Sequence, residues 1–490
     1  MYGYWSLILV GIAILWCFPW KESTVSPPAT VTVDPSGLTP DGFDSSGPGG
    51  DPPRDIIPTR LLPHDVARFL VTHDPNTNMT ESKTVAEVLL EPLGLEITSF
   101  KELQTLWAGY GHICSLTAKP TDSKAAAVIR HLAHAKGSNN TFFLILKLIA
   151  PPPGPTDEGH LRKILSYDVE QYFYEFVAPH LEDDTAVAHC MTSSWKAKRD
   201  GGELKDVTAT IMTDLRVHFP VEGGKRAYLG PRAVQSALEW LARFHSSSWK
   251  SLPANLNEYL LPPLDEFKRR ETGTGGTKLW LNGGYTYLAT RRKEYDSLCV
   301  DTYSEWSGAL CTPFQGSEKS TAEVVADFLT PTGRPFETLI HGDVKSENLF
   351  TNDAGDDVSF VDFQYVGLGL GVCDLAKLFT CSVPLDMLTD NPSIPHEMGM
   401  DKGEEALLFL YHETLLTRRP AEKEPVDYDW DTLVRHWETA LVDWCRFQAS
   451  WGFWGNTEWL EARVRYILKD EGWKAWLAKE NVGRGRALSI

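Results

Sequence analysis

The segment LIHGDVKSENLF, residues 339–350, places acidic, basic and amide side chains directly after a short apolar run. Asp343 could orient a hydroxyl group and accept its proton, and Asn348 offers a neutral oxygen of the kind that binds Mg²⁺. A second apolar run, 358–363, contains Asp362, a carboxylate that could bind the same ion. One aspartate for an acceptor hydroxyl and an Asn–Asp pair for magnesium are the groups that phosphoryl transfer uses.

Two other ionisable residues of the first segment have less certain roles. Lys345 could neutralise charge that develops on a transferred phosphoryl group, or it could be a solvated loop lysine. His341 is expected to order the loop through a backbone hydrogen bond, since a second general base would duplicate Asp343. A simple turn cap is the alternative for His341 and Asp343. The spacing to Asn348 and Asp362 favours the catalytic interpretation.

The segments HGDVKSENLF, VDFQYVGLGLGVCDLAKLF and LEWLARFH together resemble the aminoglycoside phosphotransferase and choline kinase superfamily, most closely its ecdysteroid kinase-like, CHK-type branch. The resemblance covers about residues 61–480 and is strongest over 335–380. It implies a bilobal protein-kinase-like fold of α+β class, with a small sheet-rich N-lobe and a larger, mostly helical C-lobe. It also implies that Asp343 is the catalytic aspartate, that Asn348 and Asp362 bind Mg²⁺, and that the phosphoryl donor is ATP.

Such a fold requires a nucleotide cradle in the amino-terminal half. Gly109 and Gly111 lie between expected strands over 97–107 and 112–119, where missing Cβ atoms let backbone N–H groups approach phosphates. The third glycine of a GxGxxG pattern is absent because position 114 is cysteine. An ordinary hairpin turn is therefore as well supported as a phosphate-binding loop.

Lys147 stands in the middle of an apolar strand expected over 141–150, where a buried charge needs a partner. It could hold the α- and β-phosphates while paired with a helix glutamate, or it could extend to water from an edge strand. The helix expected over 161–181 carries Glu170 beside its apolar stripe, with Glu175 as the rival. The resemblance favours Glu170 as the partner.

Three further positions complete the predicted site. Asp214 and Leu215, at the end of a strand expected over 207–215, are predicted to form the hinge where backbone groups meet adenine. A strand-end turn is the alternative for Asp214. In CDLA, Asp374 matches an aspartate that braces the catalytic loop in folds of this kind, a role compatible with capping a helix.

The periodicity of the sequence supports this division of the chain. Residues 61–215 combine one early helix with strands and an interposed helix, whereas residues 216–490 are mostly helical. Within the second part, helices are expected over 230–249, 430–448 and 457–468.

The amino terminus differs in kind from the rest. Within residues 1–22, the apolar run 5–20 is slightly shorter than the ~20 residues that a membrane-spanning helix needs. It could be an uncleaved anchor, a cleaved signal peptide or an artefact of the gene model. Residues 23–60, rich in Pro, Gly, Ser and Asp, are expected to be a disordered linker. We predict single-pass membrane association with a cytosolic catalytic domain; a soluble cytoplasmic protein is the alternative.

The composition limits the partners. A formal net charge of −19 argues against general affinity for nucleic acid, which requires clustered Lys and Arg. Any anionic ligand must therefore be met by local cations. The eight cysteines show neither a CxxC pair nor zinc-like spacing, so buried free thiols are expected. No protein partner is evident.

These observations predict an ATP-dependent small-molecule kinase that phosphorylates a hydroxyl group of a metabolite such as a steroid, a choline-like or amino alcohol, or a sugar. A pseudokinase or scaffold is the first alternative. A protein kinase is less well supported, because the interval between Asp362 and Asp374 is too short for a long activation segment. The carboxy-terminal helices are rich in aromatic residues, which could bind the acceptor or simply form the core: Tyr428, Trp430, Trp437, Trp444, Phe447, Trp451, Phe453, Trp454 and Trp459.

Overall fold

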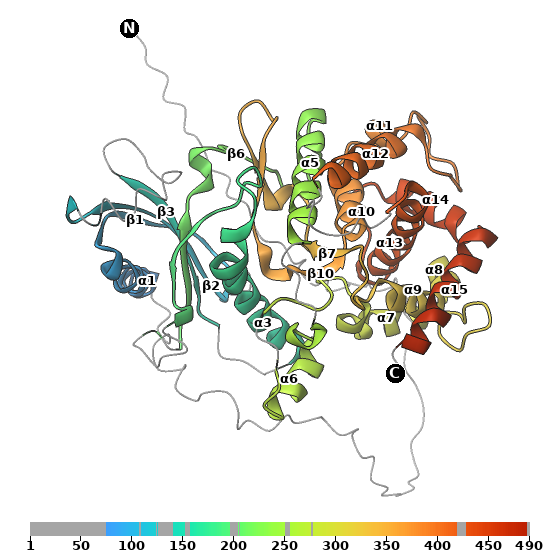
Figure 1. Cartoon of the computed structure of the whole chain (residues 1–490), viewed down its shortest axis with the longest axis horizontal. Coiled ribbons are helices and arrows are strands. Elements are labelled where there is room, and N and C mark those ends of the chain that lie inside the picture. Colours follow the sequence, from blue (N-terminus) through green and yellow to red (C-terminus); the bar gives the residue numbers. More distant parts are fainter. Residues whose placement is uncertain are drawn as a thin grey trace, which may run out of the picture.

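A computed structural model describes most of the chain beyond the amino terminus. The described residues are 75–106, 109–123, 125, 141–151, 157–196, 204, 206–249, 255–275, 278–418 and 428–487. A sheet-rich part, built by the earlier residues, lies beside a larger helical part (Figure 1). The predicted α+β class is confirmed. The predicted anchor and linker segments, 1–22 and 23–60, lie outside the described residues.

The sheet-rich part is organised around one antiparallel sheet with the order β1-β2-β3-β5-β4. Its strands are β1 (Leu95–Thr105), β2 (Gly111–Pro120), β3 (Phe142–Ile149), β4 (Cys190–Ser193) and β5 (Thr208–Thr213). Four of these were expected from the sequence, but β4 was not, because four residues are too few to show an alternating pattern. Strand β3 is central, so Lys147 pairs with Ile113 on one side and Thr210 on the other. The edge-strand alternative for Lys147 is therefore wrong.

Two helices flank this sheet. Helix α1 (Pro75–Leu90) contributes Ala86 and Leu90 to the buried cluster that also contains leucines of β2 and β3. Helix α3 (Glu158–Tyr172) begins at the N-cap Asp157, whose side chain accepts a hydrogen bond from the backbone N–H of His160. The sequence predicted one helix over 161–181. The structure instead continues α3 as a π-helical turn and then a 3-10 turn.

Two small sheets carry the segments that the sequence singled out. Strand β7 (Glu337–Ile340) pairs with β10 (Gly367–Leu370), and β8 (Leu349–Thr351) lies between β6 (Val221–Glu222) and β9 (Val358–Phe360). The loop from β7 to β8 therefore starts and ends on paired strands. Gly342 within it has φ 84°, and a Cβ there would lie 2.3 Å from the carbonyl oxygen of Tyr365, so only glycine fits.

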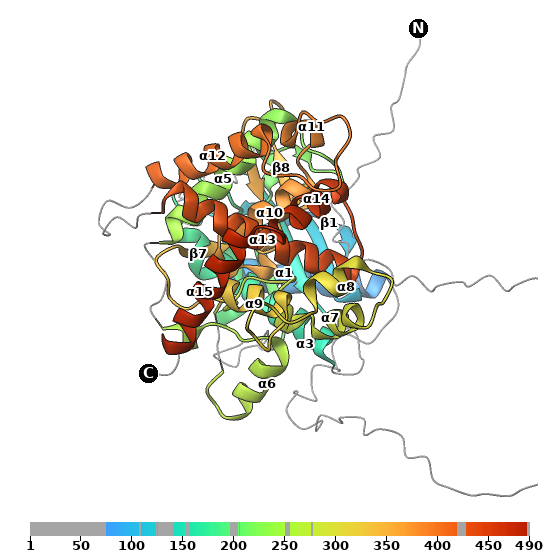
Figure 2. The same ribbon diagram turned by 90° about the vertical axis from the view of Figure 1, so that its right-hand side faces the viewer.

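The helical part packs around the 22-residue helix α13 (Trp430–Trp451), which runs through its middle (Figure 2). Helix α5 (Pro231–Ser248) buries Val234, Leu238 and Leu241, the face that periodicity predicted. The other helices are α6 (Pro263–Glu271), α7 (Arg292–Cys299), α8 (Glu305–Leu310), α9 (Thr321–Leu329), α10 (Val372–Cys381), α11 (Leu385–Leu388), α12 (Lys402–Thr417), α14 (Thr457–Ile467) and α15 (Glu471–Ala487). Cysteines in the described part are all free, as expected, but only Cys114, Cys381 and Cys445 are buried; Cys299 is exposed and the others are partly buried.

The prediction of a single-pass membrane protein is contradicted. Within the residues that the structure describes, no helix is long and apolar enough to cross a membrane. Even α13, the longest, carries charged residues such as Arg435 and Asp443 along its length, because it is an amphipathic helix of a packed bundle. The apolar run 5–20, on which the prediction rested, lies outside the described residues.

Candidate active site

A buried aspartate on α10 fixes the start of the loop between β7 and β8. Asp374 accepts hydrogen bonds from the backbone N–H groups of His341, at 2.6 Å, and Gly342, at 2.9 Å. Nε2 of His245 lies 3.2 Å from the same carboxylate. Burial alone would raise the pKa of Asp374, but the contacts with His245 and the nearby Lys377 hold it below its ordinary value. Asp374 has the bracing geometry that the resemblance implied, and the helix N-cap is Gly371.

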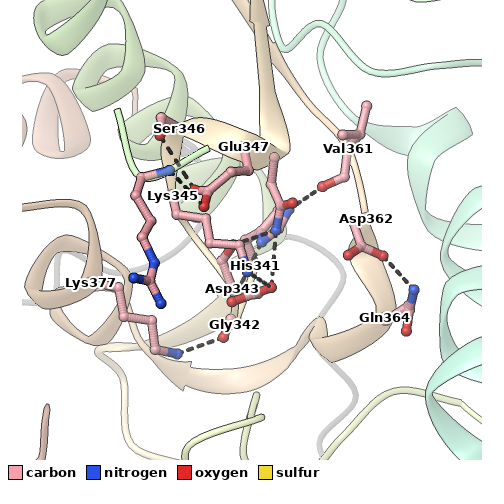
Figure 3. A network of polar contacts seen from close by, with 12 residues as sticks. His341, Gly342, Asp343, Lys345, Ser346, Glu347, Val361, Asp362, Gln364 and Lys377 are labelled. Atoms are coloured by element: carbon pink, nitrogen blue, oxygen red, sulfur yellow. Dashed lines mark hydrogen bonds and ion pairs between the residues drawn. The ribbon is translucent and has the colours of Figure 1, made fainter. Parts of the chain in front are cut away.

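His341 orders the same loop from within. Its Nε2 lies 2.9 Å from the carbonyl oxygen of Val361, and its Nδ1 lies 3.2 Å from the backbone N–H of Asp343 (Figure 3). The first contact requires a donor on Nε2 and the second an acceptor on Nδ1, so the neutral Nε2–H tautomer satisfies both. Burial lowers the pKa of His341, which favours this neutral form. The ring ties the loop to the β9 segment, as the sequence predicted.

Asp343 projects from this loop with two partners on one oxygen. Its Oδ2 accepts a hydrogen bond from Lys345 Nζ at 2.9 Å (Figure 3). The same oxygen accepts a second hydrogen bond from Asn348 Nδ2 at 3.0 Å. Burial would raise the pKa of Asp343, but the Lys345 ammonium outweighs burial and keeps it below the ordinary value. The carboxylate is therefore ionised at neutral pH, and its Oδ1 is left to receive a hydroxyl group.

A second charged cluster joins three distant parts of the chain. Lys147 Nζ, on β3, lies 2.5 Å from Glu170 Oε2, on α3, and 3.4 Å from Asp362 Oδ1, just after β9. Burial alone would lower the pKa of Lys147, but the two carboxylates raise it above its ordinary value, so the lysine stays charged. The rival Glu175 instead accepts a hydrogen bond from Ser193 at 2.8 Å. Glu170 is thus the partner, as predicted.

Asp362 has one oxygen engaged and the other free. Oδ1 also accepts a hydrogen bond from Gln364 Nε2 at 2.6 Å, whereas Oδ2 is buried without a hydrogen-bond partner in the described part of the chain. The residue has φ 66° and ψ 59°, a left-handed conformation that costs energy for a non-glycine residue. A buried, unpaired carboxylate oxygen held in a strained conformation is a good candidate for a metal ligand.

The residues that the sequence assigned to Mg²⁺ fit that ion. The side-chain amide nitrogen of Asn348 donates to the backbone carbonyl and the carboxylate of Asp343, which leaves the amide oxygen for a cation. Oδ2 of Asp362 is the second available oxygen. Across the described ranges there is no cluster of three or more His, Cys, Asp or Glu side chains suited to a metal. Mg²⁺ needs none, because it typically binds one or two protein oxygens together with substrate phosphates and water.

Lys147 and Asp362 line a pocket of about 830 Å³ between the sheet-rich and helical parts, which we name the nucleotide pocket after the ligand proposed below. Polar groups on its wall include Lys147, Glu170, Asn348 and Asp362, together with the predicted hinge residues Asp214 and Leu215. Apolar walls come from Leu103, Ile113, Ile145, Ala188, Met212, Phe350 and Val361. A mostly apolar lining with a few polar groups at fixed positions is typical of a small-molecule site.

The two glycines that were predicted to form the phosphate cradle do not line the nucleotide pocket. The residues lining the nucleotide pocket include Leu103, Gln104 and Ile113 from β1 and β2, but neither Gly109 nor Gly111. Gly111 has a packing reason, since a Cβ there would lie 2.0 Å from the carbonyl oxygen of Leu148. Gly109 has φ 70° and donates its N–H to Leu106.

At the hinge, the Asp214 side chain has a local role. It accepts a hydrogen bond from the backbone N–H of Arg216 and forms an ion pair with the same residue at 2.6 Å. This is the turn-forming role that the sequence left open. The backbone here is largely engaged as well: the Asp214 N–H donates to the carbonyl of Phe143 at 3.0 Å, and the carbonyls of Asp214 and Leu215 accept from backbone N–H groups of the following turn.

A second pocket of about 600 Å³, which we name the acceptor pocket after the ligand proposed below, is also lined by residues of the loop between β7 and β8. Asp343, Lys345 and Lys377 line it, and Glu347 lines both pockets. Its aromatic wall consists of Tyr285, Trp444, Phe447, Trp451 and Trp454. Four of these rings belong to the aromatic set that the sequence marked. Other members of that set, such as Trp437 and Trp459, are instead buried in the core.

Several residues of the site were missed from sequence. Gln364 directly follows the DF pair, and its position beside a metal-binding candidate was the available signal. Lys377 lies one turn after Asp374 on α10 and donates to the carbonyl oxygen of Gly342 at 2.6 Å (Figure 3). Tyr285 had no signal, because nothing in its local sequence marks it as lining a pocket.

Comparisons with known proteins agree with the motifs. The sequence model of the ecdysteroid kinase-like family matches residues 123–393, just over half of the chain. No curated protein sequence matches the chain.

Solved structures that resemble the chain include a macrolide 2'-phosphotransferase from Brachybacterium faecium (11% identity, TM-score 0.36, covering 78% of this chain and 97% of that one). A choline kinase from Streptococcus pneumoniae gives 11% identity and a TM-score of 0.34 over 82% of this chain and 99% of that one. An ethanolamine kinase from Plasmodium vivax gives 13% identity and a TM-score of 0.36, covering 84% of this chain and 91% of that one. Similarities this weak carry no inference about activity.

Proposed function

Because the chain belongs to the ecdysteroid kinase-like family and has the α+β, kinase-like fold predicted from its sequence, we propose that it transfers the γ-phosphoryl group of ATP to a hydroxyl group of a small metabolite. The observation that carries the proposal is the charged cluster of Lys147, Glu170 and Asp362, with Asp343 in the adjacent pocket. Folding brings these groups together although Lys147 and Asp362 are 215 positions apart in the chain. Phosphoryl transfer requires this combination of a phosphate-binding cation, metal ligands and an aspartate at the acceptor.

On the nucleotide side, the proposed roles follow from charge and position. Adenine meets the hinge backbone at Asp214 and Leu215, and the Lys147 ammonium holds phosphate oxygens while Glu170 keeps the lysine in place. Asn348 and Asp362 would hold Mg²⁺, which supplies neutralisation of phosphate charge when bound. The roles of Gly109 and Gly111 as a phosphate-binding loop remain a prediction.

On the acceptor side, Asp343 orients the hydroxyl group and takes its proton as the phosphoryl group moves. Its lowered pKa suits this role, because the transition state of phosphoryl transfer is loose and needs positioning more than a strong base. Lys345 lies beside this carboxylate, so its ammonium is close to the transferred group and can offset developing negative charge. Lys377 holds the loop by its hydrogen bond to Gly342.

The test combines a substrate screen with one substitution. The full-length protein is incubated with ATP, Mg²⁺ and a panel of alcohol-bearing metabolites, and phosphorylated products are measured by mass spectrometry. Asp362→Asn should abolish transfer with the thermal midpoint nearly unchanged, because an amide is a much poorer magnesium ligand than a carboxylate. Asp353→Asn, at an exposed aspartate on the turn between β8 and β9, is the matched control.

Unchanged transfer by Asp362→Asn at saturating Mg²⁺ would show that the metal site is misassigned. A wild-type protein that binds ATP but phosphorylates no alcohol of the panel would favour a pseudokinase.

A further inference from the structure

One wall of the acceptor pocket is backed by an arginine that belongs to the fold. The guanidinium carbon of Arg291, a residue only 1% exposed, lies 3.9 Å from the ring centroid of Tyr285, 5.0 Å from that of Trp451 and 5.9 Å from that of Phe447. All three rings line the acceptor pocket, whereas Arg291 itself does not. The guanidinium therefore contacts these rings from behind the pocket wall.

The position of this arginine is fixed by its other contacts. Nε donates to the backbone carbonyl of Tyr285 at 2.7 Å, and Nη1 lies 3.3 Å from Glu294 Oε1. The rings are fixed as well, since Tyr285 lies 5.9 Å from Phe447 and 6.2 Å from Trp451, edge-on in both cases. A buried charge held this way is a permanent feature of the wall.

The Arg291 guanidinium weakens the attraction of these rings for a cationic ligand. The attraction of a ring face for a cation comes from its negative quadrupole, and a second cation near the same rings meets repulsion from the first. Recognition of a quaternary ammonium uses ring faces of this kind. Here the Arg291 guanidinium already lies within 6 Å of the ring centroid in three of the five rings of the wall.

The charged residues that line the acceptor pocket also disfavour a cationic ligand. Arg226, Lys345 and Lys377 line it as cations, against the carboxylates Asp343 and Glu347. Asp343 already accepts from Lys345, and Glu347 accepts from the backbone N–H of Arg226. Cations thus outnumber carboxylates in this pocket although the whole chain carries a net charge of −19.

We propose that Arg291 makes the acceptor pocket select against cationic alcohols and in favour of uncharged alcohols with a broad apolar face. The inference rests on the proposed function, because it takes this pocket as the acceptor site. It assigns a specificity role to a residue that touches neither nucleotide nor acceptor.

The experiment uses two probes of the same shape, 4-tert-butylbenzyl alcohol and 4-(trimethylammonio)benzyl alcohol. Their binding to the full-length protein is measured by calorimetry without ATP. The wild-type protein should bind the neutral probe at least about tenfold more tightly, the scale expected of one lost cation–π contact. Arg291→Met should bring the ratio close to one, and Arg291→Lys should keep the preference because the charge remains.

Arg292→Met is the control, since this neighbouring arginine is half exposed and paired with Glu323 at 2.9 Å. Equal or tighter binding of the cationic probe by the wild type overturns the inference even if Arg291→Met fails to fold, and so does binding of neither probe. An Arg291→Met protein that keeps the wild-type ratio also overturns it. Absence of phosphoryl transfer, with the neutral preference present, contradicts the proposed function and leaves the selectivity of the pocket standing.

Discussion

The nucleotide pocket and the acceptor pocket are both lined by residues of the loop between β7 and β8, but different kinds of interaction organise their walls. The first is organised by ion pairs and hydrogen bonds between Lys147, Glu170, Asp362 and Gln364. The second is organised by aromatic rings on α13 and on the segment before α7. The phosphate groups of a nucleotide are always the same, so a fixed set of charged side chains can bind them. A wall of aromatic rings can instead differ in shape and packing to suit different acceptors. Under the proposed function, the first pocket holds the groups for nucleotide and metal, whereas the second combines Asp343 and Lys345 with the rings that select the acceptor.

The largest effect is expected from Lys147→Ala, on the nucleotide side. Removing the ammonium leaves Glu170 and Asp362 buried without their counter-charge, which should cost about 3–5 kcal/mol of unfolding free energy. ATP affinity should fall as well, because a phosphate contact is lost. Chemical denaturation and ATP titration measure the two effects.

The double variant Lys147→Met, Glu170→Leu is the control for this prediction, since it removes the cation and one carboxylate together. It should recover much of the stability while ATP affinity stays low. Full stability of the single variant would contradict the account of the cluster.

The second effect concerns Asp343, on the wall of the acceptor pocket. Asp343→Ala should lower kcat by about 10²-fold or more, the scale of general acid–base catalysis, with little change in the Kd of ATP. A lost turn cap would instead lower stability by about 1 kcal/mol and reduce activity only in parallel. Measuring kcat, Kd and thermal midpoint on one preparation separates these roles, and a fully active variant would contradict the kinase mechanism.

The two pockets also differ in how far the sequence predicted them. Asp343, Asn348 and Asp362 were predicted from their spacing after one apolar run and at the end of the next, and Lys147 because a charge stands out in an apolar strand. The Lys147–Glu170 pair needed the resemblance to decide between two glutamates on one helix. In these cases short-range sequence pattern and chemistry agree.

The acceptor pocket could not be predicted in the same way. Tyr285 and Trp451 are far apart in sequence, and only the packing of α13 against the segment before α7 brings their rings to 6.2 Å. Trp437, also on α13, is buried in the core. Aromatic residues on one helix thus divide between core and pocket according to the neighbouring elements, which local sequence does not encode. The π-helical end of α3 was missed for a similar reason, because tertiary packing decides it.

A smaller effect is expected from Gln364→Ala. Its side-chain nitrogen donates to Asp362 Oδ1 at 2.6 Å, and its oxygen accepts from Ser166 on α3 at 3.2 Å. The residue thus holds the metal-binding candidate against the helix that carries Glu170. We expect a higher Mg²⁺ requirement and a kcat lower by about 10-fold, the lower end of the roughly 10–100-fold loss typical when an outer-shell contact at a metal site is removed.

The comparison between the pockets makes this prediction specific. Acceptor KM should stay constant in Gln364→Ala, since Gln364 does not line the acceptor pocket. Gln364→Glu is a matched variant, because it keeps the size and replaces a donor by a second carboxylate beside Asp362. It should be more impaired than Gln364→Ala. Equal Mg²⁺ dependence in wild type and both variants would contradict a positioning role.

The smallest effect concerns pH and the ring of His341, which ties the loop to Val361 between the two pockets. Burial lowers the pKa of this ring in the folded protein, whereas the unfolded chain titrates near the ordinary value of about 6.5. Below that pH the unfolded state binds a proton that the folded state does not, so this contribution to stability is full above about 6.5 and is lost as pH falls. One such group gives at most about 1.4 kcal/mol per pH unit. His341→Gln keeps a side-chain donor for Val361 but cannot titrate. The drop in unfolding free energy between pH 7.5 and 5.5 should therefore be smaller in the variant than in the wild type, and an identical drop would show that His341 does not titrate as its burial requires.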